Sequence, residues 1–159
     1  MEYVFPLDYK FPKDKLLVEF DNLFDKKIEI QEPDSKRFSG FWLLFANDVT
    51  KKIAKDFLDY YNLPFDKYIV NFLYVEPNGI LPWHIDQGGS ISAINCILTP
   101  DPVPIEFKTV KYIYDTALID ISSLHQVMND NQSRKVFRIT FQNEEATYMK
   151  VKEILCQKL

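Results

Sequence analysis

Short apolar runs separated by turn residues fill the chain between residues 68 and 143. Some runs alternate apolar and polar residues and others are almost continuously apolar: YIVNFLYVE, ILPWHID, ISAINCIL, IEFKTVKYIY, ALIDIS, HQVM and RKVFRITFQ. The segments between them are rich in proline, glycine, asparagine and serine: PNG, QGGS, TPDPVP and NDNQS. Many short strands joined by turns are typical of β-sandwiches and barrels of the jelly-roll type. We therefore predict a mostly β fold with flanking helices, whose core spans residues 67–143.

The segment before this core predicts strands and a helix. KKIEIQE (26–32) alternates like a half-buried strand, and GFWLLFA (40–46) is typical of a more deeply buried one. The segment 47–64 predicts a helix that Asn47 or Asp48 can cap and that ends before Pro64. Its apolar side chains share one face: Val49, Ile53, Phe57 and Tyr61. Residues 1–66 should therefore support the β-rich core.

The end of the chain, residues 144–159, predicts a helix that Asn143 can cap. Its apolar residues form a stripe that is expected to dock on the rest of the protein: Tyr148, Val151, Leu155 and Leu159. No internal repeat, low-complexity tract or Gly/Ser-rich linker divides the chain. We therefore expect a single domain over residues 1–159.

Composition narrows the class of protein. Of the 159 residues, 47% are apolar and 15% aromatic, which indicates a packed globule. The net charge of −4 argues against nucleic acid as a partner, because no overall positive field attracts phosphates. The sequence has neither a signal-peptide pattern nor an apolar run long enough for a membrane helix, so we expect a cytoplasmic protein. Cys96 and Cys156, 60 positions apart, suit neither a disulfide framework nor a metal clip, and we expect both to be buried as small apolar residues.

The chain contains only two histidines, and one of them precedes an aspartate by two positions in LPWHIDQGG. On a strand His84 and Asp86 would point to the same face. This pair alone is unspecific, because 23 of the 159 residues are acidic, and a surface pair is the simplest alternative. His125 begins another predicted strand 41 positions later. Two histidines and one carboxylate can form a facial triad, which suits Fe(II) and leaves coordination positions open.

The order of these residues resembles a known family. LPWHIDQGG, SAINCIL and ALIDISSLHQVMNDNQSRKVFRITF are similar to the Fe(II)/2-oxoglutarate-dependent oxygenases, closest to their aspartyl/asparaginyl hydroxylase-like and prolyl-hydroxylase-like branches. The likeness covers about residues 71–141. It implies a double-stranded β-helix (a cupin-type jelly roll), with His84, Asp86 and His125 as iron ligands and 2-oxoglutarate as co-substrate. Aspartyl/asparaginyl hydroxylase itself lacks the carboxylate ligand, so Asp86 separates this chain from that branch.

Two arginines follow the second histidine. In the family pattern an Arg stands nine or ten residues after the distal His, and Arg134 stands nine after His125. The far carboxylate of 2-oxoglutarate in an apolar barrel needs a countercharge, and a guanidinium matches it with two hydrogen bonds. By strand alternation Arg138 shares the face of Arg134, so it is the second candidate. The alternative is a solvated face, with Phe137 and Ile139 packed inward on the other side.

Further contacts can be suggested near this site. Asn95 lies in a mostly apolar strand, where it could hydrogen-bond the co-substrate or satisfy the backbone at a bulge. Gln87 follows the proposed ligands and is expected at the mouth of the barrel. Trp42 and Arg37 are candidate substrate contacts from the N-terminal segment.

The sequence thus predicts an Fe(II)- and 2-oxoglutarate-dependent dioxygenase. Such an enzyme would hydroxylate an unactivated C–H bond of an amino-acid side chain, in a peptide or free, or of another small metabolite, and release succinate and CO2. Its partners would be 2-oxoglutarate, O2 and this substrate. Two alternatives remain: a cupin-type metalloenzyme that uses the same triad without 2-oxoglutarate, and a non-catalytic β-sandwich binding module.

Overall fold

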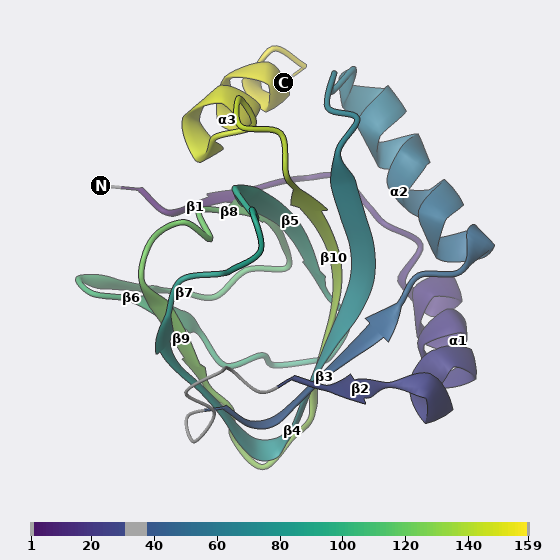
Figure 1. Cartoon of the computed structure of the whole chain (residues 1–159), viewed down its shortest axis with the longest axis vertical. Helices are drawn as coiled ribbons and strands as arrows, with labels where there is room; N and C mark the ends of the chain where they lie inside the picture. Colours follow the sequence, from purple (N-terminus) through teal and green to yellow (C-terminus); the bar gives the residue numbers. More distant parts are fainter. Residues whose placement is uncertain (1, 31–37, 159) are drawn as a thin grey trace.

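The computed structural model describes residues 2–30 and 38–158. In this part of the chain ten strands belong to one antiparallel sheet that curls into a nearly closed barrel, with three α-helices outside it (Figure 1). In chain order the strands are β1 (Val4–Pro6), β2 (Ile28–Glu29), β3 (Ser39–Phe45), β4 (Tyr68–His84), β5 (Ser92–Ile97), β6 (Ile105–Phe107), β7 (Val110–Tyr112), β8 (Thr116–Ile119), β9 (His125–Met128) and β10 (Arg134–Phe141). They pair in the order β1-β8-β5-β10-β4-β9-β6-β7, and β3 joins β4 to β2. The predicted jelly-roll fold with flanking helices is confirmed.

Strand β4 connects the two halves of this barrel. Its first half pairs with β10 from Tyr68 to Val75, and its second half pairs with β9, where His84 lies opposite His125. PNG is therefore a bend within one long strand, and the prediction of a turn between two strands was wrong. The bend depends on Asn78 at a positive φ of 61° and on Gly79, where a Cβ would meet the Val75 side chain at 2.6 Å. Bulged strands bend in this way where a barrel turns a corner.

The helices differ in how well local sequence marks them. Helix α2 (Asp48–Tyr61) begins at a capping box of Asn47 and Thr50, as the polar residues there predicted. Helix α3 (Tyr148–Cys156) is capped by Thr147, so the prediction of an Asn143 cap was wrong. Asn143 instead accepts a hydrogen bond from the Lys67 backbone at 3.0 Å and donates to Asp66 at 2.9 Å. Helix α1 (Lys13–Leu23), followed by a 3-10 turn over Phe24–Lys26, was not predicted.

Alternate residues of the central strands enter two separate apolar clusters. Phe72, Phe137 and Ile139 pack outward in the cluster that includes residues of the three helices, whereas Leu73 and Val136 belong to the cluster inside the barrel. Strand β3 is mostly half-buried, not deeply buried as predicted. It lies at the side of the sheet, between β4 and the two-residue strand β2. Among the described residues no helix is long and apolar enough to cross a membrane.

The two cysteines have different environments. Cys96 lies on β5 in the outward cluster and is buried, as predicted. Cys156 is exposed, so the prediction for it was wrong, because it ends α3 outside the docked stripe. Of that stripe Tyr148, Val151 and Leu155 are buried, and Leu159 lies outside the described residues.

Candidate active site

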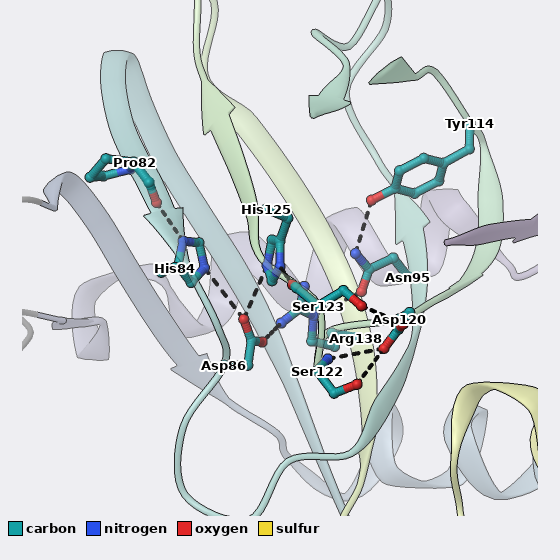
Figure 2. A network of polar contacts seen from close by, with 10 residues as sticks. All are labelled: Pro82, His84, Asp86, Asn95, Tyr114, Asp120, Ser122, Ser123, His125 and Arg138. Atoms are coloured by element: carbon teal, nitrogen blue, oxygen red, sulfur yellow. Dashed lines mark hydrogen bonds and ion pairs between the residues drawn. The ribbon is translucent and has the colours of Figure 1, made fainter. Parts of the chain in front are cut away.

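Two strands and the segment after β4 bring three polar side chains together inside the barrel. His84 ends β4, His125 begins β9, and the two residues are direct partners across these strands. Asp86 follows two positions after His84, and its Oδ1 lies 3.3 Å from His84 Nε2 and 3.2 Å from His125 Nε2 (Figure 2). One such atom from each of the three residues lies within 4.8 Å of the other two. The three side chains are thus arranged around one point.

Backbone carbonyls decide which nitrogen of each imidazole faces that point. His84 Nδ1 lies 2.6 Å from the carbonyl oxygen of Pro82, and His125 Nδ1 lies 2.7 Å from that of Ser123. Since a carbonyl oxygen can only accept, each Nδ1 must carry the proton and donate it. In the neutral imidazole Nε2 then has a lone pair, and both lone pairs point toward Asp86. Two lone pairs and a carboxylate oxygen that converge form a site for a cation.

A turn built on Asp120 supports His125 from behind. The Asp120 carboxylate accepts hydrogen bonds from the backbone and hydroxyl groups of Ser122, at 3.2 and 2.6 Å, and from the hydroxyl of Ser123 at 2.7 Å. These contacts hold the segment whose carbonyl accepts the hydrogen bond of His125 Nδ1 (Figure 2). Asp120 therefore helps to orient an imidazole that it does not touch.

Arg138 holds the other oxygen of Asp86. Its Nη1 donates to Asp86 Oδ2 at 2.8 Å, and its Nε donates to Asn95 Oδ1 at 2.8 Å. Burial alone would raise the pKa of Asp86, but the charge of Arg138 holds that pKa well below its usual value. Asp86 thus remains a carboxylate, with Oδ1 directed at the histidines.

Beside the three side chains lies a cavity of about 350 Å³. Its walls are the inward-facing residues of β3, β4, β9 and β10, most of them apolar: Phe41, Leu43, Leu73, Val75, Leu81, Val127 and Val136. Polar residues form the rest of this lining, among them the three central side chains, both arginines, Asn95 and Asn71. Such a cavity suits a small molecule that is held by a few directed polar contacts.

Arg134 lies in the wall of this cavity and is 5% exposed. Its Nη1 donates to the Val103 carbonyl at 2.9 Å, and its Nη2 donates to the Tyr114 hydroxyl oxygen at 3.3 Å. Asn95 Nδ2 donates to the same oxygen at 2.9 Å, so the Tyr114 proton is left for another acceptor. Among the described residues no carboxylate pairs with Arg134, whereas Arg138 is paired with Asp86. The Arg134 guanidinium is therefore a buried cation suited to an anionic ligand.

Comparison with known proteins gives relatives by structure only. No family model matches the sequence, and no curated protein matches it. A prolyl-4-hydroxylase from Pseudomonas putida superposes with a TM-score of 0.66 at 9% identity, over 91% of this chain and 94% of that chain. A prolyl hydroxylase from Trichoplax adhaerens, in complex with a peptide fragment of hypoxia inducible factor, gives 0.68 at 13% identity, over 89% and 83% of the two chains. A viral collagen prolyl hydroxylase from Paramecium bursaria Chlorella virus-1, in complex with 2-oxoglutarate, gives 0.57 at 12% identity, over 87% and 95%.

The chain has the fold of the prolyl hydroxylases. The resemblance to Fe(II)/2-oxoglutarate oxygenases that the sequence motifs indicated is thus confirmed at the level of the fold.

On this prolyl hydroxylase fold the other residues suggested from sequence lie in different places. Asn95 and Gln87 both line the cavity, Asn95 buried and Gln87 exposed. Trp42 does not line it: its neighbours Phe41 and Leu43 do, and the Trp42 Nε1 donates to Glu76 at 3.0 Å. The prediction of Trp42 as a substrate contact therefore does not fit, because strand alternation turns it to the other face. Arg37 lies outside the described residues.

Sequence reasoning missed three residues of the site. Tyr114, just before β8, joins Asn95 to Arg134, and no motif marked it. Asp120 lies in ALIDIS, whose pattern predicts only a strand. Asn71 lies in an apolar run, and a buried amide between apolar neighbours is the same signal that makes Asn95 a candidate.

Proposed function

We propose that this chain is an Fe(II)- and 2-oxoglutarate-dependent oxygenase that hydroxylates a C–H bond of an amino-acid side chain or small metabolite. One observation carries the proposal: two imidazoles, each with Nδ1 on a backbone carbonyl, direct their Nε2 lone pairs at a carboxylate oxygen. The likeness to prolyl hydroxylases supports it, since one of those structures holds 2-oxoglutarate and another a peptide.

The donor set fits the metal. Atoms bound at about 2.1 Å to one first-row metal ion, at right angles to each other, lie about 3 Å apart. The separations of 3.2 and 3.3 Å between Asp86 Oδ1 and the two Nε2 atoms agree with this value. Imidazole and carboxylate ligands without a thiolate suit Fe(II). When Fe(II) is bound with 2-oxoglutarate and O2, this chemistry converts the C–H bond to C–OH, and 2-oxoglutarate to succinate and CO2.

The other polar residues of the cavity would divide the remaining tasks. Arg138 keeps Asp86 ionised and occupies Oδ2, so Oδ1 is left for the metal. Arg134 would bind the far carboxylate of 2-oxoglutarate, and the free proton of the Tyr114 hydroxyl would supply a second hydrogen bond. The apolar walls would keep water from the reacting atoms.

The test is succinate release from 2-oxoglutarate by the purified chain with Fe(II), ascorbate and a screen of peptides and metabolites. We expect stimulated turnover with the wild type and none above background with His125→Ala. Because His125 supplies one of the three ligands, this variant should also bind Mn(II) at least about 100-fold more weakly, a larger loss than outer-shell changes cause.

A matched control is Lys108→Ala, an exposed residue on the turn between β6 and β7. It should change neither turnover nor Mn(II) affinity. Stoichiometric metal binding that needs His125, without 2-oxoglutarate turnover in the whole screen, would favour a cupin-type metalloenzyme that does not use 2-oxoglutarate. If the wild type binds no metal, the result would favour the third hypothesis, a non-catalytic β-sandwich binding module.

A further inference from the structure

We propose that the side-chain amide of Asn71 binds the primary substrate and that this substrate presents an amide group. The inference rests on the proposed function, because it assigns the substrate-binding half of the same cavity. Asn71 is 8% exposed and lines the cavity. Its Oδ1 is fully buried and has no hydrogen-bond partner among the residues that the structure describes. Native proteins rarely leave such an atom unsatisfied, and a ligand is one of the few partners that can complete it.

The position of Asn71 places this amide next to the metal site. On β4 it lies opposite Arg138 of β10, and Arg138 contacts Asp86. Its neighbours on the same face of the strand are Ile69 and Leu73, which also line the cavity. Ile69 is 39% exposed and lies toward the entrance, as does Ile85 at 46%. Asn71 thus presents a polar group between Ile69 and Leu73, opposite Arg138 and near the reacting centre.

2-Oxoglutarate cannot satisfy the oxygen of the Asn71 amide. Whichever way the amide is turned, its oxygen needs a hydrogen-bond donor, and the 2-oxoglutarate dianion has only acceptors. Arg134, the proposed partner of the far carboxylate, pairs with Val75, which lies about 13 Å from Asn71 along β4. In this proposal the donor therefore comes from the substrate, which would occupy this part of the cavity.

An amide group is the partner that complements Asn71 best. The asparagine side chain offers one acceptor and one donor side by side, and an amide in the substrate offers the reverse pair. The apolar neighbours indicate that aliphatic carbon surrounds this group. Two sources share this chemistry: a peptide bond beside an aliphatic side chain, and a free carboxamide on a small molecule.

Binding is tested without turnover, by ligand-observed NMR on the purified chain with and without Mn(II) and 2-oxoglutarate. One set of probes is capped amino-acid N-methylamides, and the other is aliphatic primary carboxamides. Each probe is paired with its ester, in which oxygen replaces the amide nitrogen. We expect at least one amide to bind and its ester to bind at least tenfold more weakly. The set from which the binder comes distinguishes a peptide from a free carboxamide.

The variants are Asn71→Leu, which keeps the branched shape of the side chain, and Asn71→Ala, with Asn22→Leu on the exposed face of α1 as matched control. Asn71→Leu should bind the amide as weakly as the ester and should keep the wild-type affinity for 2-oxoglutarate. Its melting temperature should be equal or higher, since an unsatisfied buried amide is removed. If Asn71→Leu folds poorly, Asn71→Ala should show the same binding pattern, and Asn22→Leu should behave as the wild type.

Several outcomes would overturn the inference: no amide probe binds, amide and ester bind equally, both Asn71 variants keep amide binding, or they lose 2-oxoglutarate instead. A large fall in melting temperature for both variants would also overturn it, because it would assign Asn71 a structural partner. Amide binding that needs Asn71, without 2-oxoglutarate turnover, would refute only the proposed function.

Discussion

Both imidazoles of the site donate their Nδ1 proton to a carbonyl oxygen two residues earlier in the chain, Pro82 for His84 and Ser123 for His125. Local backbone therefore sets the tautomer of each ring before any ligand binds. This arrangement leaves the two Nε2 atoms as acceptors that share one direction, toward Asp86. The same residue-scale logic separates the two arginines, because one already has a carboxylate partner and the other has none among the described residues.

Arg134→Leu and Arg138→Leu should therefore fail in different ways. Loss of Arg134 should weaken 2-oxoglutarate binding by about 10- to 150-fold, the value of about 1.5–3 kcal/mol for hydrogen bonds to a charged group, and leave Mn(II) binding unchanged. Loss of Arg138 should weaken Mn(II) binding, because Asp86 loses its orienting partner. Anaerobic calorimetry with each ligand measures both. The assignment would be reversed if Arg138→Leu alone lost 2-oxoglutarate.

Cys96 gives a pH dependence that is separate from the site. Burial raises the pKa of its thiol from 9.0 to about 11. Because the folded chain favours the neutral thiol, its contribution is complete below about pH 9 and is lost as the pH rises toward 11. The two pKa units correspond to about 2–3 kcal/mol in the free energy of unfolding. Urea unfolding between pH 8 and 10.5 should show a shallower decline for Cys96→Ala than for the wild type, and parallel declines would contradict this account.

At the scale of elements, the bend in β4 decides whether the site exists. One strand pairs with β10 before the bend and with β9 after it, so the bend sets the register of His84 against His125. The tight contacts of Gly79 with Val75 and with the Glu76 and Ser39 carbonyls, at 2.6 to 2.9 Å for a Cβ placed there, show how little room the bend allows.

Gly79→Ala should therefore destabilise the fold by about 1–3 kcal/mol, as overpacked sites do, and should also weaken Mn(II) binding. Asn78→Gly is the control, since its φ of 61° suits glycine and nothing there is crowded by the change. Urea unfolding and metal calorimetry on both variants measure the two effects. Unaltered stability of Gly79→Ala would mean that the bend can relax.

At the scale of the whole molecule, the sheet separates two apolar clusters with different roles. The outer cluster attaches the three helices to β4, β5 and β10, and the inner one surrounds the cavity. The residues of the candidate site thus stand on strands whose other face packs against the helices. A metal that joins β4 to β9 should therefore stabilise the whole chain by mass action.

Mn(II) at 100 times its dissociation constant should raise the free energy of unfolding by about 2.7 kcal/mol. For a chain of this size that corresponds to a rise of roughly 5–10 °C in melting temperature. Differential scanning fluorimetry with Mn(II), and again after addition of EDTA, measures the effect. His125→Ala should show no rise, and an equal rise in that variant would place the metal elsewhere.

Much of the outline of this protein follows from local sequence. The alternating runs and turn residues predicted the strands, Asn47 and the apolar face predicted α2, and the parity of β10 correctly placed Arg134 and Arg138 on the inner face. Local sequence failed where a contact with a distant residue decides. α1 has a buried face of only Leu16 and Phe20, and Asn143 has its partners at residues 66 and 67. PNG bends one long strand, which pairs with β10 before the bend and with β9 after it.

The sequence by itself determined which side chains were available: two histidines, an aspartate at the right parity and two arginines on one face. Only the tertiary structure decided how they are paired. His84 lies opposite His125, and Arg138 forms an ion pair with Asp86 whereas Arg134 faces the cavity. Asn71 Oδ1 lacks a hydrogen-bond partner among the described residues. The physical reason is range. Strand alternation and capping act over a few residues, whereas register, burial and hydrogen-bond pairing depend on strands far apart in the chain.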